Sequence, residues 1–182
     1  SSPGVPYGLP SVADCRACHE SGASPVLGFS ALQLSSERDP QAPHATQPEP
    51  GSLDLAELVR RGLVAGLPAA LAAHAPTVGA RSPVARAALG YLHGNCAHCH
   101  NARSTIAGLG LSFTVRADGT PEALSTTVGR ESQYRPTGSS IYVRVVPGAP
   151  DESLLLARVA SRQPPLQMPP LGTHRTDEEA LA

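Results

Sequence analysis

Two copies of one five-residue pattern constrain this chain more than any other feature of its sequence. The motifs are Cys15-Arg16-Ala17-Cys18-His19 and Cys96-Ala97-His98-Cys99-His100, and they contain every cysteine of the 182 residues. On one helical turn, two thiols three positions apart can reach the two vinyl groups of one haem, and the next residue projects its imidazole toward the iron from the same side. Both motifs therefore predict covalently bound haem c, with His19 and His100 as iron ligands.

Three other uses of paired cysteines account for this pattern less well. Disulfides in an exported protein do not need a histidine after each pair. A zinc ribbon places its two pairs about 15–20 residues apart, whereas Cys18 and Cys96 are much further apart. A thioredoxin-like motif occurs once, before a helix in a βαβ unit. Two motifs that use every cysteine favour two haem groups.

The sixth ligand of the second haem has one methionine candidate. Met168 is the only methionine of the chain and lies in the proline-rich segment 163–172. Such a segment has few accessible conformations, so little entropy is lost when a thioether is held against an iron. A gap-filling core methionine is the alternative. We expect Met168 to bind the second iron.

The sixth ligand of the first haem is left open between several histidines. No methionine lies between His19 and Cys96. The sixth position of the first iron is therefore filled by an imidazole or a weaker ligand, or it is open. The histidines considered are His44, His74, His93, His98 and His174. We favour His44 because it follows Pro43 in a proline-rich loop, with His93 and His74 next. A solvated loop histidine is the alternative for His44.

The pattern of apolar residues predicts a mostly α fold. We expect two small cytochrome c-like lobes, residues 1–82 and 83–182, with short β segments and proline-rich loops. The expected helices cover 11–20, 52–61, 83 to the second motif and 151–161, and a last one, capped by Thr176, is cut off at Ala182, so we expect the native chain to continue. Strands are expected over 109–115 and 141–146. The chain has no Trp and few other aromatics, and a large planar cofactor would add apolar volume to its core.

Charge and hydropathy narrow the classes of partner. The net charge is −1, which does not favour nucleic-acid binding. No apolar run approaches the roughly 18–20 residues of a membrane helix, so we do not expect an integral membrane protein. Because haem is attached outside the bacterial cytoplasmic membrane, we expect a periplasmic or extracellular protein whose signal peptide has been removed before Ser1.

Several segments together resemble a known family. They are Asp14 to His19 with Leu27-Gly28-Phe29 and Gln33-Leu34, Tyr91 to His100, Pro147-Gly148 with Ser153-Leu154, and Met168-Pro169-Pro170-Leu171-Gly172. The chain resembles the small dihaem c-type cytochromes of exported bacterial proteins, and its second half is similar to class I cytochrome c. The resemblance implies helices packed around the haem, a methionine loop on the far side, and one-electron transfer without turnover of a substrate.

Two other functions remain as alternatives. A dihaem peroxidase-like enzyme would also have two such motifs, with one iron open to peroxide. A subunit of an extracellular cytochrome polymer would stack its haems across subunits, and a neighbouring chain could supply the missing ligand. The expected partners are accordingly redox proteins or neighbouring copies of the same chain.

Overall fold

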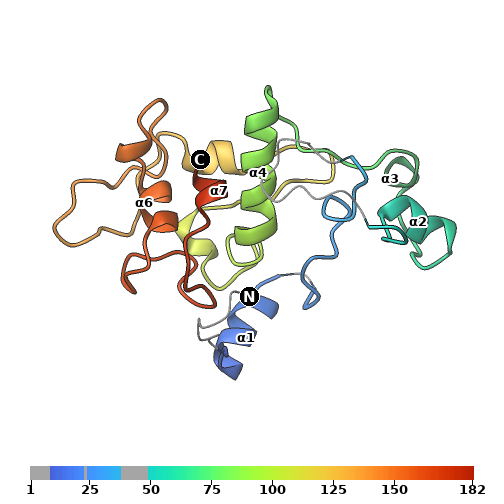
Figure 1. Ribbon diagram of the computed structural model, residues 1–182, viewed down its shortest axis with the longest axis horizontal. Coiled ribbons are helices and arrows are strands. Elements are labelled where there is room, and N and C mark those ends of the chain that lie inside the picture. Colours follow the sequence, from blue (N-terminus) through green and yellow to red (C-terminus); the bar gives the residue numbers. More distant parts are fainter. Residues whose placement is uncertain (1–8, 23, 38–48) are drawn as a thin grey trace.

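The structure is a computed structural model, and it describes residues 9–22, 24–37 and 49–182. Figure 1 shows α4 in the middle of the molecule, with α6 and α7 on one side and α2 and α3 at the opposite end. The favoured ligand His44 lies outside the described residues. The helices are α1 (Val12–His19), α2 (Leu55–Arg60), α3 (Ala69–Ala73), α4 (Pro83–Cys96), α5 (Ala123–Thr127), α6 (Leu154–Ala160) and α7 (Glu178–Leu181), with 3-10 turns η1 (Ala107–Leu109) and η2 (Pro150–Glu152).

The two motif helices begin where their capping residues predict. At α1, the Ser11 hydroxyl accepts a hydrogen bond from the Asp14 N–H at 3.2 Å, and the Asp14 carboxylate accepts one from the Ser11 N–H at 2.9 Å. This reciprocal pair satisfies two otherwise free donors of the first turn. At α4, the Ser82 hydroxyl accepts from the Ala85 N–H, and Pro83 occupies the first turn. The helices predicted for both motifs are confirmed.

Three other helices begin later than their sequence suggests. The cap of α2 is Asp54, whose side chain accepts from the Glu57 N–H, so the predicted start at residue 52 is wrong. The helix expected from residue 151 begins at Leu154, because Pro150–Glu152 form the 3-10 turn η2. The last helix, α7, is capped by Asp177 and not by Thr176.

The strands expected over 109–115 and 141–146 are wrong. Within the described ranges, β structure is limited to isolated bridges, such as the one between Val128 and Val145. A side chain takes the place of a partner strand: the Arg144 guanidinium donates to the carbonyl oxygens of Leu109 at 2.6 Å, Gly110 at 2.7 Å and Thr126 at 2.6 Å. These carbonyls are thereby satisfied without a ladder.

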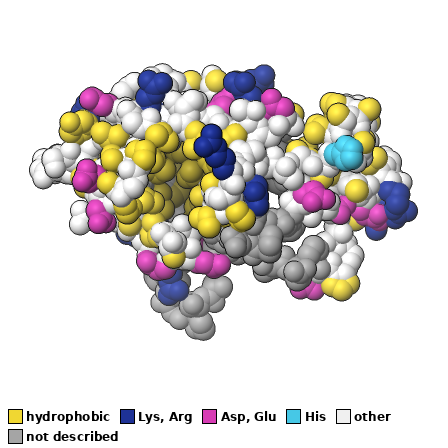
Figure 2. All heavy atoms as spheres, turned by 90° about the horizontal axis from the view of Figure 1, so that it is seen from above, with side chains coloured by type: hydrophobic (Ala, Val, Ile, Leu, Met, Phe, Trp, Pro, Cys, Tyr) yellow, Lys and Arg dark blue, Asp and Glu magenta, His cyan; other side chains and the backbone are white. Residues whose placement is uncertain are grey.

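The hydrophobic core lies in the second half and surrounds the second motif. Its buried members are Leu89 of α4, Ala97 of the motif, Phe113 and Ala123, with partly buried residues such as Leu155 packed against them. In the first half, the buried hydrophobic set of the described residues contains only Leu55, and α1 has no buried residue. Figure 2 shows hydrophobic side chains gathered around a hollow on one face of the molecule. None of the helices in the described ranges is long and apolar enough to span a bilayer.

Candidate haem-binding site

The two motifs, far apart in sequence, lie against each other. The Cys18 Sγ is 3.9 Å from the Cys99 Sγ, and the ligand atoms of Cys18, His98 and Cys99 all lie within 4.8 Å of one another. All four cysteines are free thiols. The Asn101 side-chain amide donates to the Ser21 carbonyl oxygen at 3.0 Å, which ties the turn after one motif to the turn after the other.

The first motif ends in a histidine whose tautomer is fixed. The Nδ1–H of His19 donates to the carbonyl oxygen of Pro25 at 2.6 Å. Since Nδ1 carries the proton, the Nε2 lone pair of the neutral ring is free to bind a metal. Metal-binding histidines usually donate their second ring N–H to a carbonyl or carboxylate in this way. The segment that follows the first motif therefore orients the His19 ring and leaves its Nε2 without a role in this hydrogen bond.

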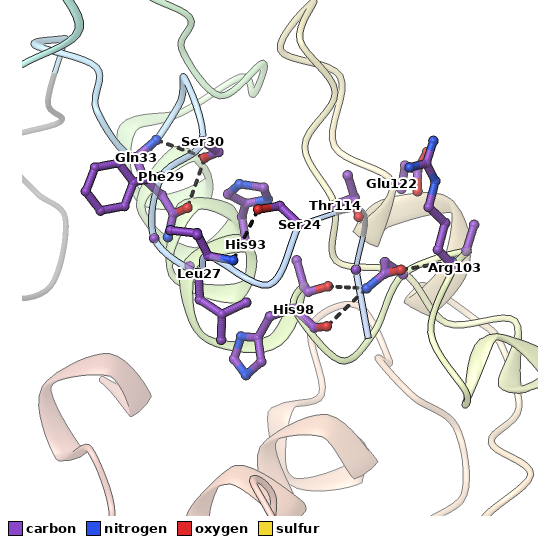
Figure 3. Close-up of a pocket in the computed structure, with 17 residues that line it drawn as sticks. Ser24, Leu27, Phe29, Ser30, Gln33, His93, His98, Arg103, Thr114 and Glu122 are labelled. Carbon is purple, nitrogen blue, oxygen red and sulfur yellow. Dashed lines mark hydrogen bonds between the residues drawn. The ribbon is translucent and has the colours of Figure 1, made fainter. Parts of the chain in front are cut away.

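A cavity of about 460 Å³ separates the loop after the first motif from the helix that carries the second. Figure 3 shows Leu27 and Phe29 of that loop, with His93 and His98 of the second half, among its lining residues. Val26 and Phe29 line the cavity although 59% and 71% of their surfaces are exposed. Its volume is within the range of small-molecule and cofactor sites, and none of the residues Cys15, Cys18, His19, Cys96, Cys99 and His100 is among those that line it.

The second motif ends in a buried imidazole. His100 is 8% exposed, and its ring meets that of Phe113 edge to face at 5.4 Å between centroids. Burial above all, and then the positive charge of Arg158, lower the pKa of His100 to about 4. The ring is therefore neutral at physiological pH, and neutral imidazole is the form that binds metals. Its Nδ1 is buried without a hydrogen-bond partner among the described residues.

The thiols of the second motif are held in their protonated form in the unmodified chain. Burial, and then the Cys99 thiol, raise the pKa of Cys96 to about 12. Burial, and then the Cys18 thiol, raise the pKa of Cys99 to about 11. Two cysteines that carried charge would repel each other in this environment. Uncharged sulfur, as a thiol or a thioether, suits both positions.

The Met168 loop is fixed to the end of α6. The Met168 N–H donates to the Arg158 carbonyl oxygen at 3.0 Å, and the Arg158 Nε donates to the Leu166 carbonyl oxygen at 3.0 Å. The Arg158 guanidinium also lies 4.3 Å from the centroid of the Tyr134 ring. Because the charge of Arg158 acts on His100, the residue that anchors the Met168 loop is also a neighbour of the second motif.

The histidines considered for the first haem are placed differently by the fold. His74 and His174 are exposed, whereas His93 and His98 both line the cavity. The Nδ1 of His93 accepts a hydrogen bond from the Val115 N–H at 3.1 Å, so the proton of the neutral ring is on Nε2. Burial lowers the pKa of His98, and the nearby His19 charge lowers it further. Sequence reasoning did not find this position of His98, because no local pattern signals it.

Comparisons with protein-family models, with curated proteins and with solved structures find no match to this chain.

Proposed function

We propose that this chain is an exported dihaem c-type cytochrome that carries single electrons and turns over no substrate. The observation that carries the proposal is the hydrogen bond from His19 Nδ1 to the Pro25 carbonyl oxygen at 2.6 Å. It prepares Nε2 as a ligand directly after two cysteines in haem-attachment spacing. A structural histidine on an exposed helix end does not require a fixed tautomer.

The second motif supports the same function by different means. His100 is neutral because it is buried, and Phe113 holds its ring edge to face. The backbone N–H of His100 donates to the Cys96 carbonyl oxygen at 2.8 Å, which keeps the motif in one turn. Cys96, Cys99 and His100 would hold the second haem, as Cys15, Cys18 and His19 would hold the first. Haem supplies an iron that gains and loses one electron.

The chain would give its two irons different reduction potentials. His19 shares its Nδ1 proton with a carbonyl, which makes the ring a stronger donor and favours the oxidised iron. The Nδ1 of His100 has no such partner in the described part of the chain, and the positive charges of Arg158 and Arg144 act on this ring. Met168, as a thioether ligand, would raise the potential further. We therefore assign the high potential to the second motif.

Mass spectrometry of the denatured, exported protein tests the proposal. The expected mass corresponds to the polypeptide with two haem additions. The double variant Cys15→Ser/Cys18→Ser should retain one haem, and so should Cys96→Ser/Cys99→Ser. A bare polypeptide mass for the exported wild-type protein would refute covalent haem at both motifs.

Replacement of Met168 tests the ligand of the second haem. Met168→His should lower the higher of the two potentials, remove the absorption band typical of ferric thioether ligation, and leave the haem content at two. Axial ligands set haem potentials over a range of about 0.8 V, so this exchange should be plain in a redox titration. An unchanged spectrum and titration for Met168→Ala would show that Met168 is not a ligand.

The sixth ligand of the first haem stays a prediction, with His44 favoured. His44→Ala should make the first iron bind carbon monoxide or cyanide readily and leave the Met168-ligated iron unchanged. His93→Ala and His98→Ala are the comparison variants, since both side chains line the cavity. Binding of these ligands by the wild-type protein would indicate an open iron and the peroxidase-like alternative. Binding only after dilution would indicate a ligand from a neighbouring chain and the polymer alternative.

A further inference from the structure

We propose that this chain holds its two haems as one electronically coupled pair, by keeping the two attachment turns in direct contact with Asn101 as the positioning residue. The inference rests on the proposed function and deepens it: the two centres would exchange electrons directly within one chain. It is carried by contacts between the motifs, which the sequence does not predict.

The first contact is between the sulfur atoms. Cys18 Sγ and Cys99 Sγ are 3.9 Å apart, which is van der Waals contact, and neither belongs to a disulfide. Each sulfur would bond to a peripheral carbon of a different haem. Because each carbon would be one carbon–sulfur bond from its sulfur, this contact would bring the two attachment points close together. The Cys99 thiol also lies 3.9 Å from the carbonyl oxygen of Ala17 inside the first motif.

The second contact is made by the Asn101 amide, directly after the second motif. Its Nδ2 donates to the carbonyl oxygens of Ala97 at 2.9 Å and His98 at 3.2 Å, which fixes the side chain on its own turn. The same nitrogen donates to the Ser21 carbonyl oxygen at 3.0 Å. Ser21 is 3% exposed, and its hydroxyl donates to the Ala17 carbonyl oxygen. Asn101 therefore joins two turns that are each held by their own hydrogen bonds.

This arrangement determines what the pair can do. Electron exchange between two centres falls steeply with the distance between their edges, and the contact keeps that distance short. Cys15, Cys18 and His19 would hold one haem and Cys96, Cys99 and His100 the other, and each haem would supply an iron that gains or loses one electron. An electron that arrives at the low-potential first motif would therefore pass to the second without leaving the chain.

Circular dichroism in the Soret band tests the inference, because two adjacent haems couple their transitions and split this band. The wild-type protein should give a split signal that does not change with protein concentration. Asn101→Leu, which keeps the shape of the side chain but cannot donate, should largely lose it. The matched control is Asn95→Leu: the Asn95 amide donates to the Tyr91 carbonyl oxygen at 3.0 Å within α4 and does not join the two turns. Asn101→Asp serves as a second variant if Asn101→Leu does not fold.

The outcomes separate this inference from the proposed function. A mass without haem refutes the proposed function itself. A mass with two haems together with an unsplit Soret signal would support the proposed cytochrome function and would overturn the coupled pair. A split signal that disappears on dilution assigns the coupling to neighbouring chains and also overturns the inference. An unchanged split in both Asn101 variants removes Asn101 as the positioning residue.

Discussion

Arg144 holds three backbone carbonyl oxygens, and we call this set of hydrogen bonds the Arg144 clamp. Its guanidinium donates three hydrogen bonds, at 2.6 to 2.7 Å, to carbonyl oxygens of Leu109, Gly110 and Thr126. A hydrogen bond to a charged group contributes about 1.5–3 kcal/mol. The Gly110 residue is exposed, so water would replace part of the loss. We expect Arg144→Met, which keeps the aliphatic stem, to lower the free energy of unfolding by about 3 kcal/mol.

Urea unfolding of the protein measures this effect, and Arg130→Met is its control. The Arg130 Nε donates one long bond, 3.3 Å, to the Ser125 carbonyl oxygen from an exposed position. Its removal should change stability by no more than about 0.5 kcal/mol. Equal losses in the two variants would show that Arg144 acts as a general surface charge. A wild-type midpoint for Arg144→Met would refute the clamp.

Four further expectations concern other parts of the molecule. Tyr91 donates to the Asp177 carboxylate at 3.1 Å and joins α4 to α7, so Tyr91→Phe should cost about 1–2 kcal/mol in a urea titration. Burial, followed by Asp177, raises the pKa of Tyr91 to about 12. The folded state therefore holds the phenol proton more tightly than the unfolded state, so the free energy of unfolding should fall as the pH rises from about 10 toward 12. In an absorbance titration one tyrosine should ionise later than the others, and Asp177→Asn should shift that step. A chain produced without haem should bind one thiophilic metal ion at Cys18, His98 and Cys99. Added Co²⁺ should give the absorption band of cobalt bound to thiolate. Cys18→Ser should abolish this band, and Cys15→Ser should retain it. Loss of the first haem in Cys15→Ser/Cys18→Ser should make the first half the earliest site of limited proteolysis, whereas cleavage that begins in α4 would contradict this order.

The starts of α1 and α4 could be predicted from local capping signals, whereas the equally local caps Asp54 and Asp177 were missed and the strands were wrong. Ser11 with Asp14, and Ser82 with Pro83, act on backbone groups three residues away, so the sequence alone contains the information. The alternation over 141–146 suggested a strand. In the fold, Arg144 instead reaches three carbonyls of distant loops. The backbone of this segment pairs only at isolated bridges, Val143 with Glu131 and Val145 with Val128, so no strand forms among the described residues.

The candidate site divides in the same way between local and distant information. The spacing of Cys15, Cys18 and His19 within one turn could be predicted, and so could that of the second motif. The contact of Asn101 with Ser21, which joins residues about eighty positions apart, has no periodic signal. Neither does the position of His98 beside Cys18. Contacts between residues of the two halves depend on how the halves pack against each other. The spacing of residues in a single sequence does not predict that packing.

If the proposed function holds, the difference between the two halves would couple the haem to the fold most strongly at the first motif. The second half buries Leu89, Phe113 and their neighbours around its motif with polypeptide alone. The first half exposes Val12 and Phe29 by 72% and 71%, and α1 contributes no buried residue. Burial of apolar area is the main favourable contribution to folding, so this half gains little of it from its own described residues. A covalently held planar group beside α1 would cover such side chains, and covalent attachment would keep it there in both oxidation states. The first haem would then act as the core of its own half as well as an electron carrier.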